Sequence, residues 1–302
     1  MSYAFAWQRR PTPASIAKRA LGRLPERLER PVRYRLIPDE TNLVYQVMRR
    51  NAASRVMLDV GACTGGALAS FARDGWTVYA FEPDATNRGK LVERWGGTPT
   101  VRIDPRAISD RTVSNVPFFR SDVSEGISGL SSFHESHRSA GTVETTTLEV
   151  FCRDEQITQV DYLKVDTEGY DLFVLRGFPW LDVSPRVVVC EFEDAKTVPL
   201  GYTFDELARY LRDLDYHVLV SEWYPIVEYG GPHRWRRFAN YPCTLADERA
   251  WGNLIATKDP DVYMRLIAAT KLLTVSWRFG GLVQRLLTSR AKAAKIGPPS
   301  RP

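Results

Sequence analysis

The chain has 302 residues, of which 44% are hydrophobic and 25% are charged, as is typical of a globular protein with one sizeable α/β core. Its formal net charge of +5 is unevenly spread: residues 1–37 hold nine Lys/Arg and two acids, and residues 263–302 hold eight Lys/Arg and no acid. The middle of the chain is therefore acidic, with a net charge of −10. This excludes the pattern of a nucleic-acid enzyme, whose positive charge would surround its active site. It favours a small-molecule enzyme whose ends touch an anionic partner.

Composition divides the chain into three parts. We expect residues 1–37 to be a basic lead-in with a short helix near 15–24, residues 38–257 to be the main domain, and residues 258–302 to be a basic helical extension with a disordered tail. The N-terminus lacks the apolar stretch of a signal peptide, and no run of eighteen apolar residues occurs, so we expect a cytoplasmic protein. Four cysteines without CxxC spacing are expected to be reduced: Cys63, Cys152, Cys190 and Cys243.

Within the main domain, segments with strand and helix patterns alternate after a first helix at residues 39–51. The expected strands are residues 55–60, 77–81, 100–103, 162–165, 186–193, 216–221 and 251–256. The expected helices between them are residues 66–73, 85–94, 172–175 and 203–214. This alternation predicts an α/β, Rossmann-like, doubly wound fold, with a mostly parallel sheet covered by helices on both faces.

Ligands of such folds bind at the carboxyl ends of the strands, and a glycine-rich turn follows the first expected strand there. Residues 59–66 read Asp-Val-Gly-Ala-Cys-Thr-Gly-Gly. Gly61 would permit the tight turn, and Gly65 and Gly66 would let the backbone approach a ligand. A tight turn without any ligand is the alternative.

The next expected strand ends at Glu82, about twenty residues beyond the glycines, where a carboxylate accepts hydrogen bonds from the ribose of an adenosine. Such an acid fits both NAD and S-adenosylmethionine. A pyrophosphate on this turn would be repelled by Asp59, whereas S-adenosylmethionine carries a cationic sulfonium and ammonium. The charge of Asp59 therefore favours S-adenosylmethionine.

A third motif lies farther along the chain. Residues 163–169 read Leu-Lys-Val-Asp-Thr-Glu-Gly, and residues 175–177 read Leu-Arg-Gly. Here the sequence resembles the FkbM family of S-adenosylmethionine-dependent methyltransferases, and the similarity covers roughly residues 54–257. It includes residues 58–62, 81–83, 107–110 and 147–148. The sequence departs from the family at Cys63-Thr64, where Asn-Ile is common.

The resemblance implies a Rossmann-like fold, S-adenosylmethionine as methyl donor, and O-methylation of a hydroxyl on a sugar, glycolipid or natural product. The cofactor-binding residues expected from the motifs are Asp59, Gly61, Ala62, Gly65, Glu82, Pro83, Ala107 and Asp166.

Methyl transfer to an alcohol needs a base that takes the hydroxyl proton. The candidates are Asp166, Glu168 and His134, the last of which lies in a long loop of the kind that often closes over a substrate. Asp166 and Glu168 would point the same way if strand geometry continued through them, with Lys164 balancing part of their charge. An ion-paired structural cluster is the alternative, and Mg²⁺ on these acids with Glu191 or Glu193 is another. No metal is predicted.

Residues 223–251 are rich in aromatic residues and arginines, which could stack on a sugar and bind an anionic group, or could form a packed cap. Beyond residue 260, basic residues recur on one helical face opposite an apolar one, which predicts contact with an anionic membrane, or docking on the domain or a second subunit. The basic face holds Lys271, Arg278, Arg285 and Lys292.

The leading functional hypothesis is therefore an O-methyltransferase acting on a small-molecule or glycolipid acceptor in the cytoplasm, at or near the membrane surface. A nicotinamide-dependent oxidoreductase on the same fold is disfavoured by Asp59 and by the absence of a Tyr-x-x-x-Lys pair after the fourth strand. A membrane-associated binding protein without catalysis is the third hypothesis. The sequence does not specify the oligomeric state.

Overall fold

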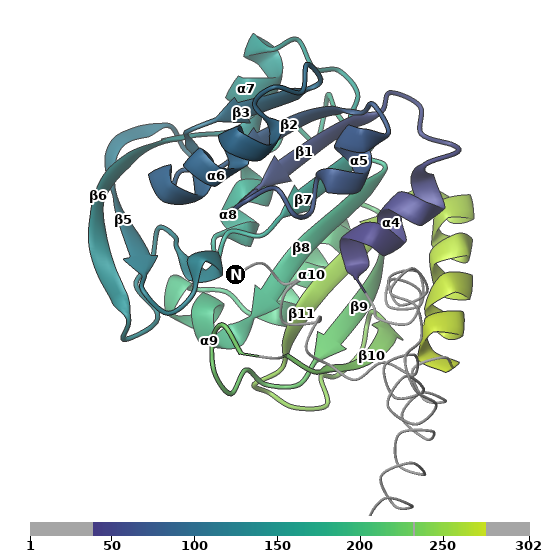
Figure 1. The fold of residues 1–302 in the computed structure, drawn as a ribbon. Coiled ribbons are helices and arrows are strands. Elements are labelled where there is room, and N and C mark those ends of the chain that lie inside the picture. Colours follow the sequence, from purple (N-terminus) through teal and green to yellow (C-terminus); the bar gives the residue numbers. More distant parts are fainter. Residues whose placement is uncertain (1–38, 232, 276–302) are drawn as a thin grey trace, which may run out of the picture.

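The computed structural model describes residues 39–231 and 233–275 (Figure 1). Its main sheet contains β1 (Val56–Val60), β2 (Thr77–Phe81), β3 (Val101–Asp104), β7 (Tyr162–Val165), β8 (Val187–Glu193), β9 (His217–Trp223), β10 (Trp235–Asn240) and β11 (Trp251–Thr257). A second sheet contains β4 (Ala107–Ile108), β5 (Val113–Ser121) and β6 (His137–Thr146). The α-helices are α4 (Glu40–Met48), α5 (Ala69–Arg73), α6 (Ala85–Trp95), α7 (Leu148–Asp154), α8 (Asp171–Arg176), α9 (Asp194–Thr197) and α10 (Phe204–Asp213). Short 3-10 turns lie at Glu125–Ile127 and Val198–Leu200, and residues 260–275 form a further helix.

The main sheet has the strand order β10-β9-β11-β8-β7-β1-β2-β3. Strands β3, β2, β1, β7 and β8 pair in parallel, whereas β11 is antiparallel to both β8 and β9. The chain winds outward from β1 to β3 and then returns to place β7 on the other side of β1. The predicted Rossmann-like, doubly wound fold is confirmed, and the switch in strand order falls between β1 and β7.

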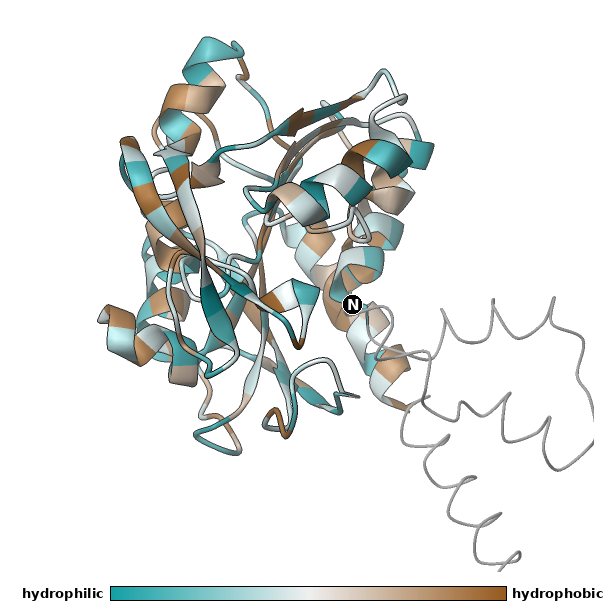
Figure 2. Cartoon of the chain, turned by 60° about the vertical axis from the view of Figure 1, so that its left-hand side comes forward, coloured by the Kyte–Doolittle hydropathy of each residue, from teal (hydrophilic) through white to brown (hydrophobic). Residues whose placement is uncertain are grey.

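Helices cover both faces of the sheet because the central strands are buried on both sides. All seven residues of β8 are buried, for example. One hydrophobic cluster packs α4, α5 and α6 against the sheet, and a second packs α7, α8 and α10 against the opposite face. In Figure 2 the helices show alternating brown and teal bands, as expected for helices that bury one side.

Strands β5 and β6 occupy a segment whose sequence predicted only a long connection. They form a ribbon beside the main sheet in Figure 1. Most of their residues are exposed or half-buried, and their burial does not alternate regularly along the strand. The sequence therefore lacks the alternation of apolar and polar residues that predicts a strand. Strand β10 was not predicted either. These strands are stabilised by pairing with a neighbour, which is a non-local interaction.

The helix at residues 260–275 packs beside α4 on the main domain (Figure 1), where Val262 and Leu266 are buried in the same cluster as Leu43. The helix at residues 260–275 is therefore docked on the domain, which was one of the alternatives predicted for the C-terminal extension. Arg278, Arg285 and Lys292, and the whole lead-in at 1–37, lie outside the described residues. Within 39–231 and 233–275, no helix combines the length and the apolar character needed to cross a bilayer.

Candidate active site

A cavity of about 420 Å³ lies at the carboxyl ends of β1, β2 and β7. This is where a doubly wound sheet is expected to bind its ligand. One part of its wall comes from the turn after β1, the tip of β2 and the loop after β7. Another part comes from the start of α4 and the segments around β9 to β11. Residues of this second part include Glu40, Trp223, Tyr229, His233 and Asn253.

The turn after β1 is held by backbone hydrogen bonds to both neighbouring strands. The amides of Gly61 and Ala62 donate to the Phe81 carbonyl at 3.1 and 3.0 Å, and the Asp166 amide donates to Val60 at 3.0 Å. Gly61 has φ +76°, and a Cβ there would lie 1.9 Å from the Asp166 carbonyl oxygen. Only glycine fits this position, so the predicted requirement for glycine has a steric cause.

Gly65 has a packing role instead. A Cβ on Gly65 would lie 2.6 Å from the Trp95 ring of α6, and the Trp95 indole N–H donates to the Gly65 carbonyl at 3.2 Å. Among the described residues, those that line the cavity include Ala62, Cys63 and Gly66 but not Gly65. This glycine allows α6 to approach the turn closely.

Glu82 lies at the tip of β2 on the cavity wall and is almost fully buried. Its two carboxylate oxygens accept hydrogen bonds from the amides of Cys63 at 2.7 Å and Asp84 at 2.8 Å. Burial raises the pKa of Glu82 to about 8, although the two amide hydrogen bonds oppose this shift. Each oxygen keeps a lone pair for a ligand hydroxyl. The neighbouring predicted residues Pro83 and Ala107 also line the cavity.

Asp59 is placed differently from the sequence-based argument. Its side chain is fully buried behind the wall, outside the set of cavity-lining residues in the described chain, and pairs with the Lys164 ammonium at 3.2 Å. Burial raises the pKa of Asp59, and Lys164 opposes that shift. Asp59 therefore does not itself line the cavity, and Lys164 lies between it and Asp166.

Lys164 joins Asp59 to the carboxylate that does reach the cavity. Its Nζ lies 3.4 Å from Asp166 and donates to the Gly61 carbonyl at 3.1 Å. Burial alone would lower the pKa of Lys164, but the charges of Asp59 and Asp166 outweigh it and raise the pKa. Lys164 therefore stays charged and lies between the two carboxyl groups.

Glu168 belongs to a second buried group. Its Oε2 lies 2.6 Å from the Nζ of Lys196, which also contacts Glu193 at 2.8 Å and Glu191 at 3.0 Å. Burial raises the pKa of Glu168 to about 8, and Lys196 opposes the shift. Strand geometry does not continue through Asp166 and Glu168, because β7 ends at Val165 and Glu168 has φ 57°.

Lys196 was not identified as a functional residue from the sequence. The available signal was its position three residues after Glu193, where a strand passes directly into α9. The contacts of Lys196 with Glu168 and Glu191 join segments that come together only in the fold, so the sequence could not show them.

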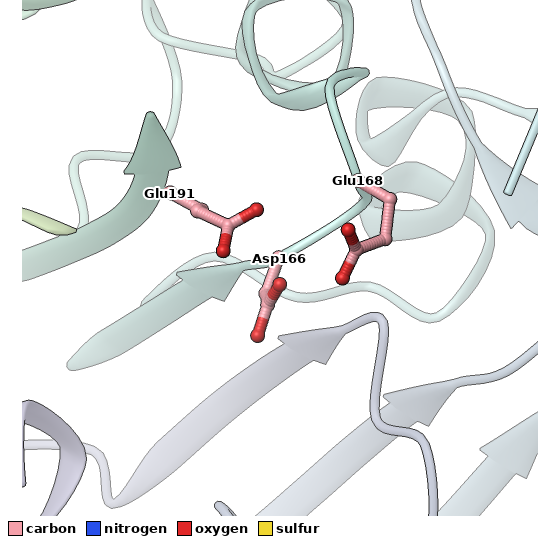
Figure 3. A group of neighbouring side chains, drawn as sticks. All are labelled: Asp166, Glu168 and Glu191. Atoms are coloured by element: carbon pink, nitrogen blue, oxygen red, sulfur yellow. The ribbon is translucent and has the colours of Figure 1, made fainter. Parts of the chain in front are cut away.

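The side chains of Asp166 and Glu168, from the loop after β7, converge with that of Glu191 from β8 (Figure 3). One carboxylate oxygen from each lies within 4.8 Å of the others, a spacing that could surround a metal ion. The ammonium of Lys196 already contacts two of these three carboxylates.

His134 lies one layer away from the cavity, with its ring 5.1 Å from the ring of the cavity-lining Tyr229. The Ser136 amide donates to its Nδ1 at 3.2 Å, so the proton of the neutral ring lies on Nε2. The ring therefore has no free lone pair for a substrate proton. His137 is similarly committed, since Nδ1 accepts from Phe133 and Nε2 donates to Ile127.

The aromatic and arginine-rich segment mostly forms a packed cap. Trp223, Trp235 and Trp251 form a buried cluster, and only Trp223 among these three also lines the cavity. Arg236 and Arg237 bind the buried Glu222 at 3.0 and 2.6 Å. These two arginines therefore contribute to the packed cap, one of the two alternatives for this segment.

A family model described as a methyltransferase FkbM domain matches residues 59–218, which span the glycine turn, Glu82 and the paired acids. The chain belongs to the FkbM methyltransferase family. The resemblance predicted from the sequence is confirmed. Membership of this methyltransferase family implies S-adenosylmethionine as the methyl donor. No curated protein matches the chain.

Several solved structures are similar in fold to this FkbM methyltransferase. A methyltransferase FkbM from Methylobacillus flagellatus KT is 16% identical, with a TM-score of 0.42, over 84% of this chain and 57% of that one. A precorrin-6y C5,15-methyltransferase from Geobacter metallireducens GS-15 is 12% identical, with a TM-score of 0.36, over 74% and 92%. A SAM-dependent methyltransferase from Agrobacterium tumefaciens is 11% identical, with a TM-score of 0.39, over 72% and 60%.

Proposed function

We propose that this methyltransferase transfers the methyl group of S-adenosylmethionine to a hydroxyl group of a sugar in a glycolipid, a glycan or a glycosylated natural product. The observation that carries the proposal is the position of Glu168. Its buried carboxyl lines the cavity, and burial raises its pKa to about 8. A carboxylate with that pKa is suited to take a proton from an alcohol near neutral pH.

The donor is assigned to the part of the cavity between β1 and β2. Glu82 would accept hydrogen bonds from the ribose hydroxyls, and the backbone from Gly61 to Cys63 would lie against the methionine part. Asp166, with 18% of its side chain exposed, is the carboxylate available to the cationic end of the donor. Its contact with Lys164 at 3.4 Å holds its orientation beside the cavity.

In the proposed reaction the acceptor hydroxyl approaches the methyl carbon in line with the carbon–sulfur bond. A bond forms between the hydroxyl oxygen and the methyl carbon while the carbon–sulfur bond breaks, and its electron pair stays on sulfur. The products are the methyl ether and S-adenosylhomocysteine. The hydroxyl proton passes to the Glu168 carboxylate. Neither His134 nor His137 is assigned as the base, because the hydrogen bonds of their ring nitrogens leave no free lone pair for the proton.

The acceptor is assigned to the part of the wall formed by Trp223, Tyr229 and Asn253. Flat aromatic faces suit sugar rings, and amide and phenol groups suit their hydroxyls. Arg236 and Arg237 form ion pairs with Glu222, so neither is assigned to the acceptor.

Two titrations test the donor assignment. Calorimetry with S-adenosylmethionine and with NAD should show saturable binding of the first only, and binding of NAD alone would overturn the proposal in favour of an oxidoreductase.

Incubation with labelled donor and a series of sugar, glycolipid and glycoside acceptors then tests the reaction. Tight donor binding with no label transfer to any hydroxyl acceptor would favour a protein without this activity.

Peripheral contact with an anionic membrane remains part of the proposal for the C-terminal helix. Met264, Leu272 and Val275 are exposed on it, beside the exposed Lys271 and Arg265. Such a surface suits a membrane that carries a lipid-linked acceptor. Co-sedimentation with vesicles of anionic and of neutral lipid tests this contact. Equal recovery with both kinds of vesicle would contradict it.

A further inference from the structure

The acid cluster beside the cavity contains its own positive charge. Three glutamates surround one ammonium group, since the Nζ of Lys196 lies 2.6 Å from Glu168, 2.8 Å from Glu193 and 3.0 Å from Glu191. The ammonium donates hydrogen bonds to Glu168 and Glu191, whereas its contact with Glu193 is an ion pair without a hydrogen bond. The side chain of Lys196 is 1% exposed, and those of the three glutamates are 3 to 7% exposed, so this arrangement is screened from water.

The packing around Lys196 fixes where this charge lies. Its Nζ lies 5.3 Å from the ring centre of Phe133 and 5.8 Å from that of Tyr229, and both contacts favour a cation. The Tyr229 hydroxyl also donates to Glu193 at 3.1 Å. On the other side, a Cβ on Gly169 would lie 3.2 Å from the Cβ of Lys196, so a larger residue there would press on this side chain.

The same carboxylates have the spacing of a metal site. Oxygens of Asp166, Glu168 and Glu191 lie within 4.8 Å of one another. A divalent ion bound to Glu168 and Glu191 would lie next to the Lys196 ammonium, and the two positive charges would repel each other at close range in a buried site. Asp166 is in turn paired with Lys164 at 3.4 Å. Bound metal and the observed position of Lys196 are therefore alternatives.

We propose that Lys196 is a positioning residue that acts as the built-in cation of this site, holding the Glu168 carboxylate at the cavity wall in the place that a divalent metal could otherwise occupy. The main chain of Glu168 has φ 57°, a conformation that non-glycine residues seldom adopt. The contact with Lys196 supplies an interaction that holds the side chain in this orientation. The role of Lys196 in positioning Glu168 as the base rests on the proposed function. The occupation of the cation site by the Lys196 ammonium does not.

The test is the binding of Tb³⁺, measured by luminescence on the whole purified chain, with Ca²⁺ as competitor. The wild-type protein should give no saturable signal at micromolar Tb³⁺, whereas Lys196→Met should gain a site that is lost again in the double variant with Glu168→Gln. Lys90→Met is the matched control, because Lys90 pairs with Glu125 at the surface and should gain no site. Ca²⁺ should also raise the melting temperature of Lys196→Met but not that of the wild type.

Two results would overturn the proposal. The first is saturable Tb³⁺ binding by the wild-type protein that Glu168→Gln abolishes, because the cluster would then bind metal with Lys196 present. The second is a folded Lys196→Met protein that binds Tb³⁺ no better than wild type, with Lys196→Gln taking its place if the methionine variant does not fold. Loss of methyl transfer is not used in this test, so failure of the proposed reaction would be seen separately.

The effect on the base is measured by activity at varied pH. If Lys196 positions Glu168, Lys196→Arg should keep the wild-type pH profile and most of the turnover, whereas Lys196→Met should lower turnover more than it raises the KM for the donor. Equal turnover of Lys196→Met and wild type would show that Lys196 does not position the base.

Discussion

The Glu82 carboxylate accepts a hydrogen bond from the backbone amide of Cys63 at 2.7 Å, so the tip of β2 holds the turn that follows β1. The residue assigned to the ribose therefore also shapes the turn assigned to the methionine part. Changes at Glu82 should affect both the donor affinity and the local stability, and the two effects can be measured separately.

Glu82→Ala should weaken the binding of S-adenosylmethionine by about 1–3 kcal/mol, because the ribose hydroxyls lose their acceptor. Isothermal calorimetry with S-adenosylmethionine and S-adenosylhomocysteine measures this loss. Glu93→Ala on the exposed side of α6 is a control that should leave affinity unchanged. Unchanged affinity in a folded Glu82→Ala protein would contradict the ribose assignment.

Asp59→Asn should lower the free energy of unfolding by about 3–5 kcal/mol, because it removes one partner of a buried ion pair with Lys164. Its effect on donor affinity should be smaller than that of Glu82→Ala, since Asp59 lies behind the cavity wall. Urea denaturation and calorimetry measure the two quantities. The exposed Asp213→Asn serves as control. A larger effect on donor binding than on stability would show that Asp59 acts on the bound donor from behind the wall.

Gly61→Ala should be much more destabilising than Gly75→Ala. The two glycines have nearly the same backbone angle, φ +76° and +75°, so the cost of a left-handed alanine is shared. Only at Gly61 would the added Cβ meet another atom, the Asp166 carbonyl oxygen at 1.9 Å, whereas nothing lies within 4 Å at Gly75. We expect about 1–2 kcal/mol for Gly75→Ala and several kcal/mol for Gly61→Ala. Similar melting temperatures for the two variants would show that the turn can move.

Turnover should rise with pH until Glu168 is ionised, with an inflection near its raised pKa of about 8. Glu168→Gln should lower turnover by roughly 10²–10⁴-fold and remove this inflection. The measurement is the rate of label transfer at saturating donor across pH 6 to 9, with buffers of about equal ionic strength. An inflection that persists in Glu168→Gln would assign the titration to another group.

The raised pKa of Glu168 also makes the stability of the fold depend on pH, but stability should fall with rising pH whereas turnover should rise. The pKa of Glu168 is raised from 4.5 in the unfolded chain to about 8, so between these values the folded state binds more protons than the unfolded state. The stability from this group is therefore present at low pH and is lost as pH rises towards 8, by at most about 1.4 kcal/mol per pH unit. Glu168→Gln should flatten this part of the curve, measured by denaturation at several pH values. Equal slopes for both proteins would be the contrary result.

His134→Ala should reduce turnover by less than about tenfold, well below the loss expected for Glu168→Gln. His134 is not among the described residues that line the cavity, and its Nδ1 already accepts from Ser136. The comparison of kcat between the two variants decides between the bases first considered. A loss at His134 as large as that at Glu168 would show that the loop moves when substrate binds.

The sequence by itself determined the alternation of strands and helices, the glycine after β1, the acid near the end of β1 and the acids that follow β2 and β7. These features are local, because hydrophobic periodicity and the backbone freedom of glycine act over a few residues. For this reason the fold class, Gly61, Glu82 and the segment from Asp166 to Glu168 could be predicted. The family resemblance rested on the same segments.

The tertiary structure decided which of these acids reach the cavity. Asp59 is directly opposite Lys164 in neighbouring strands, a pairing that exists only once β1 and β7 lie side by side in this register. Lys196 likewise meets Glu168 only because α9 follows β8 at the same edge of the sheet. Pairing between distant segments sets these ion contacts, and the spacing of residues along the chain does not encode it. Burial then fixes each charge to one partner, so side-chain charge alone could not show which carboxylate faces the ligand.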